Sequence, residues 1–138
     1  LVQVFVNSGM NLNELISMPQ YIAESFAGSL GSVWIFVAPF LGELGAFITG
    51  SATVSTLTFS PIQYNVANQV GLDVNTVLAV QLLGGAAGNM ICVHNVVAAS
   101  AVVGLAGKEG EIIRKTLGTA ILYGVLAGLA GFMYLTFF

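Results

Sequence analysis

The sequence Gly88-Asn89-Met90-Ile91-Cys92-Val93-His94-Asn95 lies in the middle of a run, residues 74 to 107, that contains no Asp, Glu, Lys or Arg. As one helix this run would extend roughly 50 Å, whereas a bilayer core is about 30 Å thick and needs about 20 helical residues. A break at the polar stretch removes the mismatch. Non-helical backbone at membrane depth is tolerated where it lines a cavity, as in the broken helices of secondary transporters. We therefore predict a broken transmembrane helix at 75–106, with a substrate site at the break.

The composition is typical of an integral membrane protein. Hydrophobic residues make up 57% of the chain and charged residues 7%, against roughly 25% charged residues in soluble domains. Three basic residues and a net charge of −3 do not provide the basic face that binds nucleic acid, so we expect no nucleic-acid partner. One Cys and one His fall short of a zinc site, so we expect no metal and no cofactor.

The chain begins without Met, inside the apolar segment Leu1–Val6, and we expect it to be part of a longer protein. Residues 1–138 are predicted to form a single transmembrane transport domain, a C-terminal fragment whose partners include the missing N-terminal part. Residues 7–31 are a polar connection. Within it a short amphipathic helix is predicted after a Ser17 cap, from the helical spacing of Met18, Tyr21, Ile22 and Phe26.

Residues 32–70 predict a re-entrant helical hairpin. The first arm, 32–49, is apolar and has Trp34 near its start, where an interfacial aromatic would lie. A hydroxyl-rich tip, GSATVST at 50–56, leads into a second arm that is uncharged yet too polar to face lipid, and such a segment must be shielded by protein. The alternative is a pair of ordinary membrane spans.

Basic residues indicate the orientation. The loop 107–115 holds all three of them, Lys108, Arg114 and Lys115, and is therefore predicted to be cytoplasmic. The last helix, 112–138, is then expected to cross to the outside, and the hairpin to open on the outside. The last helix also carries Gly124 and Gly128, whose spacing favours close helix contact, although it can arise by chance in a Gly-rich sequence.

A small carboxylate buried at this depth must exchange its hydration for hydrogen-bond donors. Helix N-termini supply backbone N–H groups and a positive dipole end, and we expect two of them, near Thr56 and near Asn95. Hydroxyls and amides add further donors, although helix capping, packing and satisfaction of the broken backbone also explain them. The predicted substrate-binding residues are Ser51, Thr53, Ser55, Thr56, Asn89 and Asn95.

Two residues are candidates for proton coupling. His94 has an unperturbed pKa of about 6.5, and it acts either as the proton carrier or only as a donor to substrate. Glu43 is an acidic residue inside an apolar arm, where a charge is costly. Cys92 is interpreted as a buried apolar filler. Because residues two apart on a helix point to different faces, Cys92 and His94 do not form a nucleophile and base, and we predict that the chain is not an enzyme.

Several motifs together resemble the lactate permease family of proton-coupled 2-hydroxyacid symporters. They are APFLG at 38–42, GAF at 45–47, GSATVST at 50–56, GNMICVHNVVAA at 88–99, VGL at 103–105 and GKEG at 107–110. Relatives show the motif GS-x-T-x-S-N at the tip. This chain has Ala52 at the first x position and Thr56 in place of the final Asn.

The resemblance implies a multi-pass protein of the inner (cytoplasmic) membrane with paired hairpins and broken helices. Its implied function is proton-coupled symport of lactate and related short 2-hydroxy monocarboxylates such as glycolate. The alternative function is a non-transporting membrane scaffold or subunit held together by small-residue helix packing.

Overall fold

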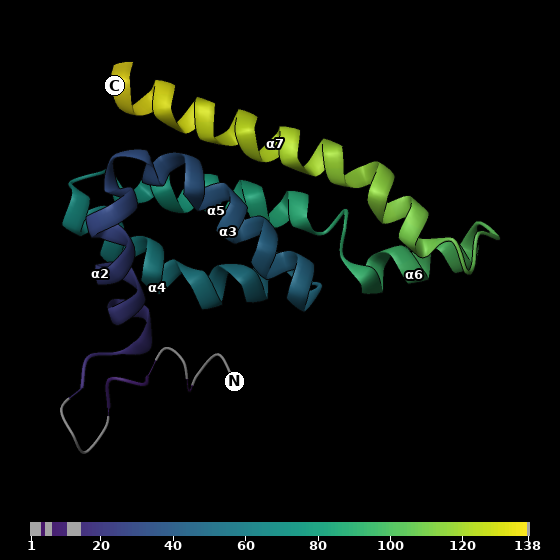
Figure 1. The fold of residues 1–138 in the computed structure, drawn as a ribbon, viewed down its shortest axis with the longest axis horizontal. Coiled ribbons are helices and arrows are strands. Elements are labelled where there is room, and N and C mark those ends of the chain that lie inside the picture. Colours follow the sequence, from purple (N-terminus) through teal and green to yellow (C-terminus); the bar gives the residue numbers. More distant parts are fainter. Residues whose placement is uncertain (1–3, 5–6, 11–14, 138) are drawn as a thin grey trace.

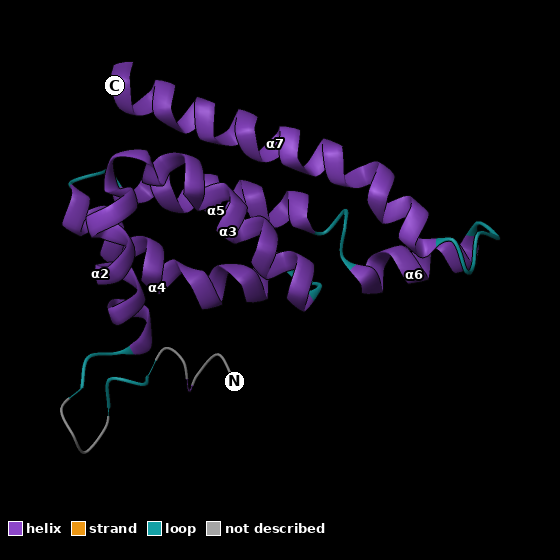
Figure 2. Ribbon diagram, viewed as in Figure 1, coloured by secondary structure: helices purple, strands orange, loops and turns teal. Residues whose placement is uncertain are grey.

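The computed structural model describes residues 4, 7–10 and 15–137, and most of the apolar segment Leu1–Val6 lies outside them. The described residues are helical and contain no strand, as predicted (Figures 1 and 2). The elements are α2 (Met18–Leu30), η1 (Gly31–Val33, a 3-10 turn), α3 (Trp34–Thr49), α4 (Ala52–Val70), α5 (Val74–Gly88), α6 (Val93–Val102) and α7 (Glu109–Phe137).

Helices α3 and α4 form the predicted hairpin, but its tip is shorter than 50–56. Gly50 ends α3 with a left-handed φ of 73°, and Ser51 is extended, with φ −146° and ψ 120°. The Ser51 hydroxyl accepts a hydrogen bond from the N–H of Val54 at 3.3 Å, so Ser51 caps α4. The expectation that the second arm begins near Thr56 is therefore wrong by one helical turn, since α4 begins at Ala52.

The polar residues of α4 that are buried point into the hairpin, which shields them from lipid. Ser55 is fully buried and donates to the carbonyl of Gly42 at 2.7 Å. Gln63, also fully buried, accepts from the indole N–H of Trp34 at 2.7 Å and donates to the carbonyl of Ala38 at 3.3 Å. The interpretation of Trp34 as an interfacial aromatic is wrong, because its side chain has no exposed surface and belongs to the core.

Helix α5 packs against both arms of the hairpin, and glycines bring it close to α3. A Cβ at Gly84 would overlap the carbonyl of Pro39, and a Cβ at Gly42 would overlap that of Gln81. At the other end of α5, Gly71 (φ 77°) and the capping residue Asp73 make the turn from α4. This packing aligns the hairpin alongside α5 (Figure 1).

The predicted break is present at residues 89–92, between α5 and α6. Helix α6 begins at Val93, two residues before the predicted start, and ends at Val102 rather than near 106, with Gly104 (φ 71°) and Gly107 (φ 87°) in the following turns. Helix α7 then begins at Glu109, so Arg114 and Lys115 belong to its first turns and not to a loop.

Helix α7 runs back along α3 and α5 over the length of the molecule (Figure 1). The predicted small-residue face is confirmed: Gly124 and Gly128 are buried and pack on Phe40, Glu43 and Phe36 of α3. The rings of Phe36 and Phe132 lie 5.5 Å apart. The two helical regions long and apolar enough to cross a membrane, among the described residues, are Val74–Val102, which includes the break, and Glu109–Phe137.

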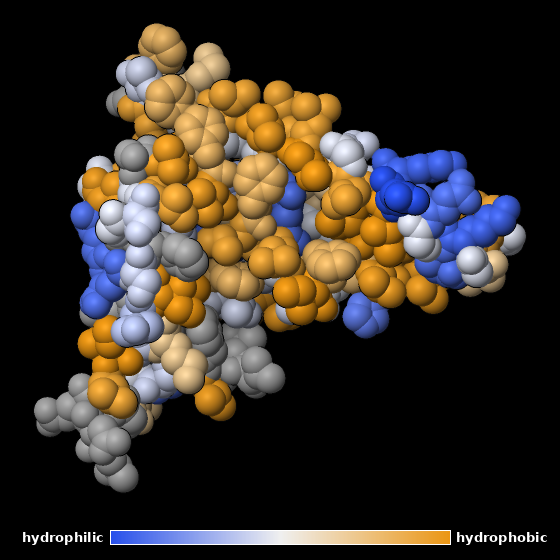
Figure 3. Space-filling view, viewed as in Figure 1, coloured by the Kyte–Doolittle hydropathy of each residue, from blue (hydrophilic) through white to orange (hydrophobic). Residues whose placement is uncertain are grey.

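The outer face of α7 carries apolar side chains, and one group of polar side chains in this view lies where α6 joins α7, with others at the opposite edge (Figure 3). At the other end of the molecule, α2 begins directly after Ser17, as predicted. Ile22 packs on the core cluster, whereas Met18 and Tyr21 are exposed. The predicted contribution of the Phe26 side chain lies outside what is described.

Candidate functional site

The tip of the hairpin meets the break between α5 and α6. A Cβ added at Gly50 would lie 3.2 Å from the Sγ of Cys92 and 3.3 Å from the Nδ1 of His94. Both approaches are tighter than ordinary van der Waals contact, and the left-handed φ of Gly50 already favours glycine. The residue at position 50 therefore sets how closely the tip approaches the break.

This contact brings two helix N-termini to one place. Helix α4 starts two residues after Gly50, and α6 starts one residue after Cys92 (Figure 1). Cys92 occupies the N-cap position of α6 and makes no capping hydrogen bond through its side chain. The first turn of α6 thus retains backbone donors that a ligand can use, which is the usual chemistry of an anion site at a helix N-terminus.

The four hydroxyl residues of the predicted site have different surroundings. Thr53 is exposed in the first turn of α4, and Ser51 is the half-buried cap. Thr56 donates to the carbonyl of Ala52 at 2.9 Å within α4. Ser55 is committed to the carbonyl of Gly42 inside the hairpin. Ser51 and Thr53 are thus the hydroxyls placed at the tip itself.

The two asparagines lie on either side of the break and are joined across it. The side-chain amide of Asn95 donates to the carbonyl of Asn89 at 3.1 Å. The Oδ1 of Asn89 is buried and has no hydrogen-bond partner among the described residues. Asn95 therefore provides a hydrogen bond to one backbone carbonyl at the break. The Oδ1 of Asn89 remains an acceptor that a donor such as a hydroxyl group can use.

His94 is exposed on the first turn of α6, and its Nδ1 lies 3.5 Å from the Sγ of Cys92. The expectation that these two side chains point to different faces of one helix is wrong, because Cys92 is the extended N-cap residue that precedes α6. Cys92 is fully buried, as expected of a filler. The structure places the His94 ring beside Gly50 at the tip of the hairpin.

Glu43, the second coupling candidate, lies away from the tip on the side of α3 that faces α7. Its side chain is 6% exposed, and its Oε1 is buried without a hydrogen-bond partner among the described residues. Its backbone packs on the end of α5, where a Cβ at Gly88 would come within 2.8 Å of the Glu43 Cα. The two candidates thus occupy separate environments.

Sequence reasoning missed Gln81. This residue of α5 is fully buried, and neither atom of its amide has a hydrogen-bond partner among the described residues. The signal in the sequence was an amide in the middle of an uncharged helix, which by itself does not distinguish burial from exposure. At Gly42, α3 approaches the backbone carbonyl of Gln81 closely.

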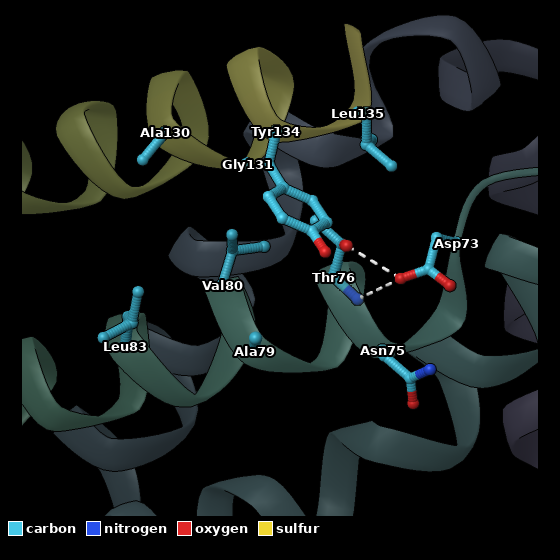
Figure 4. Close-up of a pocket in the computed structure, with 10 residues that line it drawn as sticks. All are labelled: Asp73, Asn75, Thr76, Ala79, Val80, Leu83, Ala130, Gly131, Tyr134 and Leu135. Atoms are coloured by element: carbon cyan, nitrogen blue, oxygen red, sulfur yellow. Dashed lines mark hydrogen bonds between the residues drawn. The ribbon is translucent and has the colours of Figure 1, made fainter. Parts of the chain in front are cut away.

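A separate cavity of about 750 Å³ lies at the opposite end of α5, between α5 and the last turns of α7 (Figure 4). Asp73 and Thr76 stand opposite Tyr134 there. The hydroxyl and the N–H of Thr76 donate to Asp73 at 2.7 and 2.8 Å and hold the pKa of that carboxyl below its usual value. An ionised carboxylate at this cavity repels anions, so the tip and the break remain the candidate anion site.

A helical hairpin whose tip meets the break of an apolar helix is the kind of arrangement on which secondary transporters build their binding sites. The chain belongs to the L-lactate permease family, whose model matches residues 1–138. It is a membrane protein of a family of permeases and not of enzymes.

Individual relatives agree with the family. The chain is 43% identical over 122 residues to a putative L-lactate permease of Haemophilus influenzae, covering 88% of this chain and 23% of that protein. It is 37% identical to an L-lactate permease of Escherichia coli, over 71% of this chain and 18% of the relative. It is 33% identical to the glycolate permease GlcA of Escherichia coli, over 81% of this chain and 20% of the relative. The chain thus spans about a fifth of the length of these relatives. No solved structure matches it.

Proposed function

We propose that this chain is part of a secondary transporter that carries lactate and related short 2-hydroxy monocarboxylates, glycolate among them, across the cytoplasmic membrane together with protons. The observation that carries the proposal is the contact of Gly50 with Cys92 and His94, because it gathers the N-termini of α4 and α6. The names of the relatives, lactate and glycolate permeases, support the substrate class.

In this proposal the substrate carboxylate lies between the two helix N-termini. Backbone N–H groups of α6 and the hydroxyls of Ser51 and Thr53 donate to it, which offsets the loss of its hydration. The unpartnered Oδ1 of Asn89 accepts from the substrate 2-hydroxyl, which distinguishes a 2-hydroxy acid from an acid without that group. Ser55, Thr56 and Asn95 hold the tip and the break in shape through their bonds to backbone carbonyls.

The proposal also includes the topology. Residues 1–138 form one multi-pass transmembrane unit in which the hairpin opens outside and the start of α7 is cytoplasmic, since Lys108, Arg114 and Lys115 lie there. His94 and Glu43 are the two candidates within this chain for exchange of the coupled proton. The remaining residues of the site come from parts of the transporter outside this chain.

Uptake of labelled lactate into proteoliposomes that contain the full-length parent, with and without an inward proton gradient, tests the function. Gradient-driven accumulation is expected, with competition by glycolate and weaker competition by propionate, which lacks the 2-hydroxyl. Absence of uptake at normal protein incorporation would favour the scaffold alternative. Accumulation that does not depend on the proton gradient would contradict proton coupling.

His94→Gln separates the two roles of the imidazole. If His94 carries the proton, the variant retains counterflow exchange of lactate but loses gradient-driven accumulation. If His94 only donates to substrate, the variant shows weaker apparent affinity, while accumulation at saturating lactate still follows the gradient. The second result would leave Glu43 as the candidate within this chain for proton coupling.

A further inference from the structure

Glu43 is enclosed by α7, and the glycine opposite it makes this possible. A Cβ at Gly124 would lie 2.6 Å from the Oε1 of Glu43 and 2.9 Å from the ring of Phe40. The absence of a side chain at position 124 is therefore what admits the carboxyl group between α3 and α7. Oε1 is buried without a hydrogen-bond partner among the described residues, so the closed packing offers this oxygen no donor, and a negative charge there is costly.

The other groups around Glu43 do not neutralise it. It lines a cavity of about 350 Å³ whose remaining lining residues are apolar: Phe40, Leu44 and Phe47 of α3, Ile91 of the break, and Ile113 and Leu117 of α7. Helix α3 has no second titratable residue, and α5 has none. On α7, Lys115 pairs with Glu111 at 2.8 Å, and Arg114 and Tyr123 are exposed. The Sγ of Cys92 lies beside the Nδ1 of His94.

We propose that Glu43 is a proton-binding site coupled to helix packing: it takes up a proton when α3 closes on Gly124 of α7 and releases it when the two helices separate. The closed arrangement binds the neutral carboxylic acid, since a buried, unpaired carboxylate is costly. Separation widens the 350 Å³ cavity that Glu43 already lines and lets water reach the carboxyl group. The proton on Glu43 and the α3–α7 packing then stabilise each other by linkage.

This inference deepens the proposed proton coupling and rests on it only for its role in transport, because the packing change is measurable without substrate. The ring contact of Phe36 with Phe132 reports on the closed arrangement. Phe36→Cys with Phe132→Cys, in the full-length parent with its other cysteines replaced, can be joined by a short bifunctional thiol reagent. Reagent reactivity at each pH is corrected with the two single-cysteine variants.

The closed form holds one more proton than the open form, so raising the pH must favour the open form, by at most about tenfold per pH unit. Cross-linking is expected to fall with rising pH in the parent and to be independent of pH in Glu43→Gln, whose neutral amide allows the closed packing. The same pH dependence in Glu43→Gln would overturn the inference, as would cross-linking in the parent that does not change with pH.

Gly124→Ala supplies an independent variant with a matched control. The added Cβ displaces the Glu43 carboxyl, so the cross-linking of Gly124→Ala is expected to be weaker at every pH. Gly118→Ala lies on the same helix with nothing within 4 Å of the added Cβ, and is expected to behave as the parent. Equal cross-linking in the two variants would contradict the role of Gly124. If these results hold while lactate uptake fails, the packing inference stands and the proposed function falls.

Discussion

At the scale of single residues, Gly50 and Gly71 invite comparison because both have a left-handed φ but only one has close neighbours. Gly50 ends α3 against Cys92 and His94, whereas a Cβ at Gly71 would meet nothing within 4 Å. The backbone cost of a non-glycine residue, roughly 1–2 kcal/mol, applies to both. A difference between the effects of the same substitution at Gly50 and at Gly71 therefore measures the contribution of the contact between the tip and the break.

Gly50→Ala is expected to weaken lactate affinity far more than Gly71→Ala, because only the former pushes the tip away from the break. Initial rates of lactate uptake by the full-length parent and both variants, at matched incorporation, give the comparison. Equal effects of the two substitutions would mean that backbone strain, and not the tip contact, explains the loss.

The two hydroxyls at the tip give a second prediction. Ser51→Ala and Thr53→Val are each expected to weaken lactate binding by roughly 1–3 kcal/mol, the cost of leaving a carboxylate with one donor fewer. Thr58→Val, which removes a hydroxyl one turn further along α4 that donates to the carbonyl of Val54, is the control. Equilibrium binding of labelled lactate measures all three, and unchanged affinity in Ser51→Ala and Thr53→Val would assign these hydroxyls to packing.

At the scale of elements, sequence reasoning located the hairpin and the broken helix but misplaced their ends. The uncharged run and the apolar first arm were sufficient to predict that these helices exist, because membrane thickness limits helix length. The tip was predicted too long because a single residue, Ser51, caps α4. Burial of Trp34 and of Gln81 depends on which helix packs alongside, and that information lies in contacts between distant residues.

The start of α5 supplies a prediction on stability. Because hydrogen bonds from Thr76 lower the pKa of Asp73 in the folded protein, the cap is fully effective above the ordinary pKa of the carboxyl and is lost as the pH falls through the lower folded value. Asp73→Ala is expected to lower the thermal unfolding midpoint in detergent at neutral pH, and Asp73→Asn to lower it less, since an amide oxygen still caps the helix. Midpoints that match the parent in both variants would show that the cap adds nothing.

The hairpin predicts which ends of the elements share a side of the membrane. Cysteines at Ser29 and Gln69, exposed positions near the start and the end of the hairpin, should react with an impermeant thiol reagent from outside. A cysteine at Gly110, where a Cβ meets nothing within 4 Å, should react only from inside. Reaction of positions 29 and 69 from opposite sides would contradict the hairpin, because the segment between them would then cross the membrane an odd number of times.

At the scale of the whole molecule, α7 forms an apolar outer flank, and both arms of the hairpin pack against α5. Exposed apolar side chains cover the outer face of α7 (Figure 3). Exposed polar residues, Asn68 and Gln69 among them, lie near the open end of the hairpin on α4. The core cluster holds the open end of the hairpin against α5, and the tip lies beyond that cluster, beside the break. The molecule thus combines a packed base with a candidate site where the tip meets the break.

The most direct test of the central claim, that tip and break form one substrate site, is protection of cysteines by lactate. Thr53→Cys and His94→Cys, each in the full-length parent without other cysteines, are alkylated by a small thiol reagent over a series of lactate concentrations, with a cysteine at Gly110 as the unprotected control. Both site cysteines should be protected with the same half-saturating lactate concentration. Protection of only one, or of neither while lactate is still transported, would contradict the claim.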